Sequence, residues 1–306
     1  MRAAHVVELG APPVAVEVDG GGSVEILAVA LNPVDLAVAA GRFYGGHPPL
    51  PYIPGSEAVG RRNSRRVYLF GEGRGTVADG FLVERLDFPV EHAAPVPDDL
   101  DDALAAACGI AGIAGWIPVA TRAPVRPDDR VLVLAATGTV GSVALQAARL
   151  LGAERVVAAG RDEGRLERAR ELGADDVVAL GGDDLVQRLK EACGGDGPTL
   201  VVDPLWGEPV RAAAEAAAPN ARIVHVGQSA GPEATFTSAA VRGKQLSILG
   251  HSNFGLSPDE RRRAYLELAG HVAAGRITID VEVFPIDEIA EAWNAQARGA
   301  KAVVTF

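Results

Sequence analysis

Cysteine is scarce in this sequence, and so are long apolar runs. Two cysteines, Cys108 and Cys193, stand among 306 residues, too few for a disulfide framework. Cys108 lies in the apolar segment AAACGI, where we expect a buried structural thiol. The opening MRAAHVVELGAPP lacks the apolar core of a signal peptide. We also expect no uncharged apolar run of about 18 residues, the length that a membrane span needs. These absences predict a soluble, cytoplasmic protein.

Basic charge is also in short supply. The formal net charge is −11, and no basic cluster suits a nucleic-acid backbone, so we expect no nucleic-acid partner. The arginine-rich segments GRRNSRR and DERRRA are short, and we expect them on the solvated surface. What the chain does have is apolar content, because 48% of its residues are hydrophobic. That content is enough to form the core of two ordinary domains or one large one.

From Arg130 onward, short β-branched runs alternate with amphipathic helical segments. The runs are RVLVLA, RVVAAG, DVVAL, TLVVD, RIVHV and LSILG. The segments between them include SVALQAARLL, GRLERAREL, DLVQRLKEA and PVRAAAEAAA. Strands of almost continuous apolar character are buried on both faces, and helical crossovers make them parallel. The pattern therefore predicts an α/β fold with a doubly wound parallel sheet.

The turn after the first of these strands, AATGTVG, has the spacing of a dinucleotide fingerprint. Ala136, Gly138 and Gly141 occupy its three positions, with alanine in place of the first glycine. Gly138 would let a pyrophosphate approach, and Gly141 would let the helix pack closely on the strand. The amides that open the helix, at Thr139 and Val140, would bind the anion. The strand-turn-helix context favours a dinucleotide site over a purely structural turn.

The end of the second strand indicates which dinucleotide binds. NAD-specific sites place an acidic residue there, whereas this chain has Gly160 followed by Arg161, with Arg165 one turn further on. A glycine leaves room for a 2′-phosphate, and arginine binds phosphate through charge-assisted hydrogen bonds. Asp162 would repel that phosphate if it turned inward, but a position at the helix start exposes it to water. These residues predict NADPH; the alternative is that both arginines are solvated helix residues.

The rest of the chain has a different character. Before Arg130, glycine and proline are frequent and short β-like runs dominate, up to a helical stretch in DDLDDALAAACGIAGIAGWIPVA. After Gly250 come two helical segments and two β-like segments, the last being KAVVTF. We expect a β-rich domain over residues 1–116 and 254–306, and a dinucleotide-binding domain over 117–253.

Several segments, in this order along the chain, resemble the medium-chain dehydrogenase/reductase superfamily and its zinc-free quinone oxidoreductase (zeta-crystallin-like) branch. LNPVDLAVAAGRFYGGHPPLPYIPGSEAVG resembles the substrate-domain signature, and RVLVLAATGTVGSVALQAARLLGAERVVAAG resembles the cofactor segment. LVVDPLWG, ARIVHVGQSAG, ILGHSNF and FPIDEIAEAW…GAKAVVTF are similar to later segments. The resemblance implies a chaperonin-ten-like catalytic domain beside a Rossmann domain. It also implies NADPH-dependent reduction of quinones or α,β-unsaturated carbonyls.

The sequence departs from the pattern of this family at two places. After Gly60 the family has a longer hairpin, whereas RRNSRRVYLF follows at once here, which should remodel one wall of the substrate domain. The threonine and alanine that the family places before a tryptophan are Ala114 and Gly115 here, so a hydroxyl near the nicotinamide is missing.

Zinc ligands are missing from the pattern too. A catalytic zinc needs cysteine, histidine and carboxylate ligands, and a structural zinc needs four closely spaced cysteines. The cysteine ligand of zinc-containing relatives would fall within NPVDLAVA, and we do not expect His47 and Glu57 to form a site by themselves. Without a Lewis acid, alcohol oxidation loses its main electrophile, whereas a quinone or enone needs only positioning and hydrogen-bond donors.

The resemblance also points to residues around the substrate. It implies Tyr44 and Asn32 as hydrogen-bond donors, with Tyr52 as a weaker substitute for Tyr44. Tyr44 is equally well explained by aromatic packing in FYGG, and Asn32 by a turn. For Asp35 we favour the turn-stabilising role that Asp commonly has before helices.

Three further residues follow the later Rossmann strands. The resemblance implies that Gly227 contributes to the cofactor site and that His251 and Asn253 lie near the nicotinamide. The alternative for His251 and Asn253 is that they are ordinary turn formers at a strand end.

The last Rossmann strand, LSILG, should lie at the edge of the sheet. An apolar edge is a liability unless it is covered, so we expect a homodimer through Leu246 and Ile248. Two functions stay open: a reductase of quinones or enones, and an NADPH-binding, redox-responsive protein without significant turnover.

Overall fold

The structure is a computed structural model that describes residues 1–89 and 93–306. The chain forms two compact units: Met1–Gly112 together with Leu256–Phe306, and Ile113–Gly255. We call them the β-rich unit and the Rossmann unit. Their boundaries lie at residues 112/113 and 255/256, where the sequence led us to expect 116/117 and 253/254.

The Rossmann unit contains the predicted parallel sheet. Its six strands follow the order β10-β9-β8-β11-β12-β13, and every neighbouring pair is parallel. The strand order changes direction between β8 and β11, and open α/β sheets have their ligand-binding crevice at the carboxyl ends of the strands at such a point. The strands are β8 (Arg130–Leu134), β9 (Arg155–Gly160), β10 (Asp176–Ala179), β11 (Leu200–Asp203), β12 (Arg222–His225) and β13 (Ser247–Gly250).

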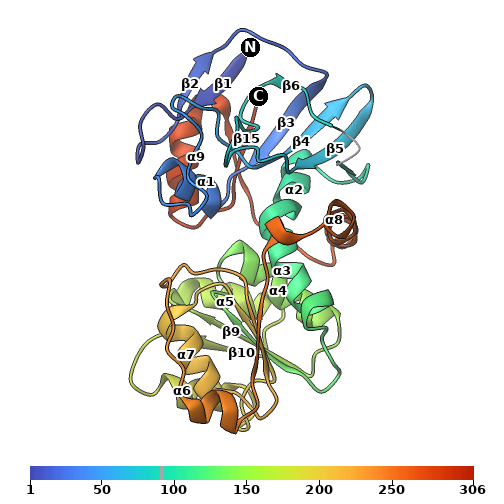
Figure 1. Ribbon diagram of the computed structural model, residues 1–306. Coiled ribbons are helices and arrows are strands. Elements are labelled where there is room, and N and C mark those ends of the chain that lie inside the picture. The colour runs from blue at the N-terminus through green and yellow to red at the C-terminus, as the bar shows by residue number, and fades with distance from the viewer. Residues whose placement is uncertain (90–92) are drawn as a thin grey trace. The chain divides into compact units, whose positions relative to one another are not determined.

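Helices connect these strands and flank the sheet (Figure 1). Each buries its small or aliphatic positions against the sheet, as amphipathic helices do; in α5, for example, Leu166 and Ala169 are buried and the charged positions are exposed. The predicted helical segments are confirmed. They are α4 (Thr139–Leu150), α5 (Glu163–Glu171), α6 (Leu185–Ala192) and α7 (Gly207–Ala216).

The β-rich unit contains both chain termini (Figure 1). Its main sheet has the order β14-β15-β3-β4-β5-β7, with β6 pairing to β3, and β1 and β2 form a separate pair. The C-terminal strand β15 lies between β14 and β3, so the tail returns to this unit as the sequence led us to expect. The strands are β1 (Arg2–His5), β2 (Val14–Glu17), β3 (Val24–Ala30), β4 (Glu57–Arg62), β5 (Arg65–Phe70), β6 (Arg85–Leu86), β7 (Ala94–Pro95), β14 (Glu282–Pro285) and β15 (Ala302–Thr305).

The shortened segment after Gly60 is a tight hairpin. Strands β4 and β5 pair directly, and Arg62 faces Arg65 across a two-residue turn. Asn63, the first turn residue, has a φ of 55°, a conformation that asparagine tolerates better than most residues.

The helices of this unit are α1 (Pro33–Ala39), α2 (Asp102–Ala107), α8 (Pro258–Ala273) and α9 (Ile289–Ala297).

A helical stretch at Asp102–Arg122 runs from one unit into the other and includes α3 (Ile113–Ile117). By length and composition it is the one helix among the described residues that could cross a membrane, which corrects our expectation that the chain has no such run. In the structure 78% of its most apolar window is buried inside the protein, as in a core helix. At Gly109 the helical geometry breaks, with a ψ of −120°.

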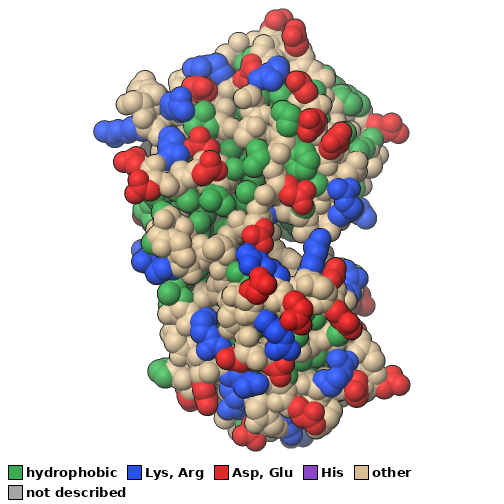
Figure 2. All heavy atoms as spheres, turned by 180° about the vertical axis from the view of Figure 1, so that it is seen from behind, with side chains coloured by type: hydrophobic (Ala, Val, Ile, Leu, Met, Phe, Trp, Pro, Cys, Tyr) green, Lys and Arg blue, Asp and Glu red, His purple; other side chains and the backbone are tan. Residues whose placement is uncertain are grey.

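The surface carries side chains of both charges, and the two cysteines are buried. On the face drawn in Figure 2, hydrophobic side chains gather over part of the β-rich unit, and acidic and basic side chains are interspersed over the Rossmann unit. Cys108 and Cys193 are buried free thiols, and burial raises the pKa of each to about 12, so neither is a reactive thiolate.

The arginine-rich segments are solvated in part: Arg61, Arg62, Arg65 and Arg263 are exposed as expected, whereas Arg66 and Arg261 are half-buried. Arg66 donates to the carbonyl oxygens of Pro97, Asp98 and Leu100, which fixes the loop before α2. The Arg261 guanidinium lies 4.2 Å from the centre of the Phe70 ring, a cation–π distance.

Candidate functional site

The fingerprint turn connects β8 to α4 at the crevice of the Rossmann sheet. Ala136 is buried, and its amide donates to the carbonyl of Ala159 in β9 at 3.0 Å, which ties the turn to the neighbouring strand. Gly138 is the N-cap of α4 and supplies no side-chain cap. The amides of the first turn, including those of Thr139 and Val140, therefore have no capping side chain and are available to an anion.

The two glycines of the turn differ in the space around them. A Cβ atom on Gly141 would lie 2.3 Å from the carbonyl oxygen of Ala135 and 2.7 Å from the Cα of Ala136. A Cβ atom on Gly138 would meet one atom within 4 Å, that same oxygen at 3.6 Å, which is an ordinary contact. Gly141 is therefore required for packing the helix on the strand, whereas Gly138 faces open space.

This contrast predicts that the two glycines respond differently to alanine. Gly141→Ala should lower the free energy of unfolding by about 1–3 kcal/mol, the usual cost of overpacking. Gly138→Ala should leave stability within about 1 kcal/mol but weaken the binding of NADPH, because the new methyl group occupies the approach of a pyrophosphate. Urea denaturation and a fluorescence titration with NADPH measure the two effects. Equal loss of stability in both variants would contradict this assignment.

The carboxyl end of β9 places the predicted specificity residues beside this turn. A Cβ atom on Gly160 would lie 2.9 Å from the Thr137 methyl group, so the strand end and the turn are in contact. Arg161 is exposed, and its side chain has no hydrogen bond or ion pair among the described residues. Asp162 caps α5 by accepting from the Arg165 amide at 3.1 Å, and it also lies 3.8 Å from the Arg165 guanidinium. Its carboxylate is thus engaged at the helix start, as we favoured.

The remaining predicted residues follow β12 and β13, so they also lie at the carboxyl end of the sheet. A Cβ atom on Gly227 would lie 2.9 Å from the carbonyl oxygen of Pro204, so glycine allows a close backbone approach there. His251 pairs with Asn253, the distance between Nε2 and Oδ1 being 2.9 Å. Burial lowers the pKa of His251, which keeps its imidazole neutral at pH 7. These residues lie at the same end of the sheet as the fingerprint turn, because all six strands are parallel and each residue follows a strand.

A cluster that the sequence reasoning missed lies at this edge. The buried Asp203 accepts from the amides of Leu205 and Trp206, and its second oxygen lies 3.1 Å from Nδ1 of His225. The Trp206 ring packs on His225 with centroids 4.1 Å apart. The signal in the sequence was an aspartate at the end of an apolar strand, in TLVVD, but its histidine partner ends a different strand.

In the β-rich unit, the predicted catalytic residue Asn32 is part of a buried polar network. Its Nδ2 donates to Ala30 O at 3.1 Å and to Glu57 Oε1 at 2.7 Å, so both amide protons are engaged. Asp35 accepts a hydrogen bond from the backbone amide of Asn32 at 2.8 Å and one from Ser56 Oγ at 2.6 Å, which is the turn-stabilising role expected of it. Burial raises the pKa of the Asp35 carboxyl to about 6, although these two hydrogen bonds oppose the rise.

Glu57 and Lys301 form the ionic centre of this network. Lys301 Nζ donates to Leu31 O at 2.9 Å and to Asn32 Oδ1 at 2.8 Å, and it lies 3.5 Å from Glu57 Oε1. The second oxygen of Glu57 accepts from Tyr68 and from the amide of Ile110, just beyond the break at Gly109. Both charged side chains are almost fully buried, and burial lowers the pKa of Lys301. Sequence reasoning did not single out Lys301.

The two tyrosines have opposite surroundings. Tyr44 is 87% exposed, in a turn closed by a hydrogen bond from the Gly46 amide to Phe43 O, and its ring packs on that of Phe43. Tyr52 is 1% exposed, and its hydroxyl has no hydrogen-bond partner among the described residues. Burial raises the pKa of Tyr52. The unit therefore does not bring Tyr44 into the Asn32 network.

The donor set of the network does not suit zinc. Among the described residues, no group of three or more His, Cys, Asp or Glu side chains is placed to hold a metal ion. Near Glu57 the available groups are an amide, a hydroxyl and an ammonium, and the Lys301 ammonium already offsets the carboxylate charge. His47 is exposed and contacts Pro48 O, so it does not join Glu57.

Known proteins match this chain in sequence and in structure. The family described as zinc-binding dehydrogenase matches residues 139–270. A phenolphthiocerol/phthiocerol polyketide synthase of Mycobacterium tuberculosis is 29% identical over 96% of this chain, which spans 14% of that much longer polypeptide. The quinone oxidoreductase of Homo sapiens is 26% identical over 99% of this chain and 95% of its own length.

Solved structures repeat the whole fold. An NAD-dependent alcohol dehydrogenase superposes with a TM-score of 0.85 at 26% identity, and the Escherichia coli quinone oxidoreductase in complex with NADPH with 0.84 at 23% identity. Each comparison covers 100% of both chains. The combination of a parallel Rossmann sheet with a mostly antiparallel β-rich unit is thus a known fold.

The fold and the matches resemble those of oxidoreductases of the medium-chain dehydrogenase/reductase superfamily. Within that superfamily, quinone oxidoreductases are 26–27% identical to this chain over 90–99% of its length. The resemblance seen in the sequence is confirmed.

Proposed function

We propose that this protein is an NADPH-dependent reductase of quinones or α,β-unsaturated carbonyl compounds. The proposal rests on two features that occur together. The first turn of α4 has no side-chain cap, and the guanidinium of Arg161, just after β9, has no partner among the described residues. The turn suits a pyrophosphate, and the guanidinium suits a phosphate on the adenosine ribose. The similarity to quinone oxidoreductases supports this reaction class.

NADPH bound in this crevice would supply a hydride from its nicotinamide. A quinone or an enone accepts a hydride without a Lewis acid, so the missing zinc ligands are consistent with such substrates. With one proton from solvent or a side chain, the products are a hydroquinone or a saturated carbonyl compound, and NADP⁺. His251, a neutral imidazole paired with Asn253 at the carboxyl edge of the sheet, is a residue that would hold the nicotinamide end.

One observation favours the second candidate, a binding protein without significant turnover. The two donors implied by the resemblance are poorly placed for catalysis, because both Asn32 amide protons serve the buried network and Tyr44 points into solvent. Their catalytic roles stay predictions.

Steady-state oxidation of NADPH, followed at 340 nm against a panel of quinones, enones and enoyl thioesters, separates the two candidates. We expect turnover with at least one class, and we expect NADPH to bind in either case. Tight NADPH binding with no turnover across the panel would select the second candidate. No binding of NADPH or NADH would reject both.

We further propose that the activity is independent of zinc. Purified protein should carry less than stoichiometric zinc by elemental analysis, and its turnover should survive mild chelation, because the buried ammonium of Lys301 stands beside the carboxylate that a metal would need. About one zinc per chain, with activity lost on chelation, would contradict this.

We also propose that the protein forms a homodimer through β13. This strand lies at one edge of the six-stranded sheet, where Ile248 is 37% exposed. If two copies paired through β13, each would cover the β13 edge of the other. Ile248→Lys should yield monomer or aggregate by light scattering. Leu266→Lys, at a position in α8 with the same 37% exposure, is the matched control and should stay dimeric. A dimeric Ile248→Lys protein would place the interface elsewhere.

A further inference from the structure

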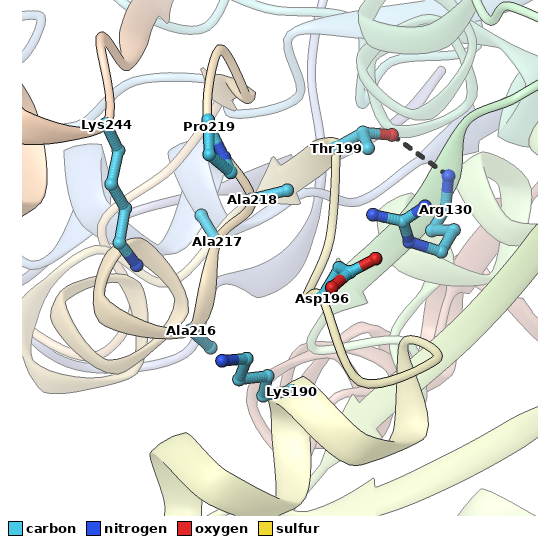
Figure 3. Close-up of a pocket in the computed structure, with 9 residues that line it drawn as sticks. All are labelled: Arg130, Lys190, Asp196, Thr199, Ala216, Ala217, Ala218, Pro219 and Lys244. Atoms are coloured by element: carbon cyan, nitrogen blue, oxygen red, sulfur yellow. Dashed lines mark hydrogen bonds between the residues drawn. The ribbon is translucent and has the colours of Figure 1, made fainter.

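The Rossmann unit has a cavity at the amino ends of its strands, whereas the fingerprint turn lies at their carboxyl ends. It has a volume of about 440 Å³, in the range of small-molecule sites, and lies where β8, β11 and β13 begin. The small residues Ala216, Ala217 and Ala218 line it together with charged side chains (Figure 3).

Three cations and one carboxylate line the cavity. The ammonium groups of Lys190 and Lys244 lie on one side, and the guanidinium of Arg130 lies on the other, next to Asp196 (Figure 3). The chain contains only three lysines among its 29 basic residues, and two of them line this cavity. In a protein with a net charge of −11, such a positive cavity is a local exception to the overall charge.

Two of the cations lack partners for their charge. Arg130 uses Nε for the Gly197 carbonyl at 3.0 Å, which leaves both terminal nitrogens without a hydrogen bond among the described residues. Lys190 is exposed, and its ammonium likewise has no partner in the described part of the chain. Lys244 differs, because it donates to the last carbonyls of α7, those of Ala214 and Glu215.

The charges repel one another in the absence of an anion. The pKa of Lys244 is lowered, first by burial and then by the positive charge of Lys190. A bound anion would relieve this repulsion and would accept from the free guanidinium nitrogens in a bidentate manner. The lining carries three positive charges and one negative charge, so a bound dianion would neutralise it.

We propose that this cavity binds the phosphate group of a small phosphorylated molecule, held between Arg130 and Lys190. Phosphate supplies two negative charges and several acceptor oxygens, which can reach donors on opposite sides of the cavity. The volume exceeds what a bare ion needs, so the proposal is a phosphate monoester rather than phosphate alone. The site is separate from the cofactor crevice and does not depend on the proposed function.

Lysine acylation tests the proposal directly. Limited acetylation followed by peptide mass spectrometry reports Lys190, with the buried Lys301 as a marker that the protein stays folded. Glycerol 3-phosphate should protect Lys190 several-fold, whereas sodium chloride at equal ionic strength should not. Equal acetylation in all salts would overturn the proposal. Protection by inorganic phosphate as strong as that by the ester would also overturn the monoester assignment.

Calorimetry with glycerol 3-phosphate provides the second measurement. Lys190→Ala should weaken binding about tenfold or more, the effect of a lost charge-assisted hydrogen bond, and Asp196→Asn should strengthen it by removing the repelling carboxylate. Arg263→Ala, an exposed arginine that does not line the cavity, removes the same charge and should have little effect. The affinity for NADPH should be unchanged in all three. Equal weakening by Lys190→Ala and Arg263→Ala would show general charge attraction and reject the site.

Discussion

Lys301→Ala is expected to lower the free energy of unfolding by about 3–5 kcal/mol, the cost of removing one partner from a buried ion pair. The side chains of Lys301 and Glu57 have exposed fractions of 2% and 0%. The variant would leave the Glu57 carboxylate in the core without its cation. It would also remove the donor to Leu31 O and Asn32 Oδ1, so several buried acceptors would lose their hydrogen bonds.

Urea denaturation of the variant and of a lysine control measures this effect. Lys190→Ala removes an exposed lysine and should change stability by no more than about 0.5 kcal/mol. A loss below about 1 kcal/mol for Lys301→Ala would mean that water or a rearranged side chain replaces the ammonium, and the network would then not be an ionic centre.

A double variant separates lost packing from an unpaired charge. Lys301→Met keeps most of the side-chain volume, and Glu57→Gln removes the charge that Lys301 offsets while keeping one acceptor oxygen. The double variant should be more stable than Lys301→Met alone, because no uncompensated charge stays at that position. If the two single losses simply add, the pair does not interact in the way we infer.

The Rossmann unit could be predicted almost completely from the sequence, because its signals are local. Each strand is a short apolar run, each helix has one apolar face, and the parallel order follows from their alternation. The fingerprint turn and the capping role of Asp162 were also readable, since both depend on residues within one turn of a helix start.

The polar network of the β-rich unit could not be predicted in the same way. Lys301 meets Asn32 across 269 residues of sequence, and no local pattern records that contact. For the same reason, Asn32 in NPVD could be read as a substrate contact, although its side chain is directed to Glu57 and Ala30. The need for glycine at position 109 is also tertiary: a Cβ atom there would lie 1.8 Å from Glu57 Oε2.

The position of Arg161 leads to the second large effect, on cofactor choice. Arg161→Ala should raise the Michaelis constant for NADPH about ten- to a hundredfold, the equivalent of about 1.5–3 kcal/mol for a hydrogen bond to a charged group. The constant for NADH should change little, because NADH has no 2′-phosphate for the guanidinium to bind. The wild-type protein should accordingly prefer NADPH.

Two neighbours sharpen the test. Arg165→Ala should have a smaller effect, because the guanidinium of Arg165 already lies 3.8 Å from the Asp162 carboxylate, whereas the Arg161 side chain has no partner among the described residues. Gly160→Asp would place a carboxylate where NAD-specific sites have one, beside Thr137, and should shift preference toward NADH if the strand end tolerates the side chain. Its melting temperature therefore has to be measured beside its kinetics.

Initial rates with both cofactors, using the best acceptor from the substrate panel, give the constants, and fluorescence titration gives the affinities without turnover. The titration keeps the prediction testable even if the protein proves to be a binding protein. A 2′-phosphate bound by Arg161 should also make NADPH affinity fall more steeply with salt than NADH affinity, since the guanidinium is exposed and its attraction is screened. Equal effects of Arg161→Ala on the two cofactors, or a wild-type preference for NADH, would remove Arg161 from the cofactor site and leave it a solvated residue at the start of α5.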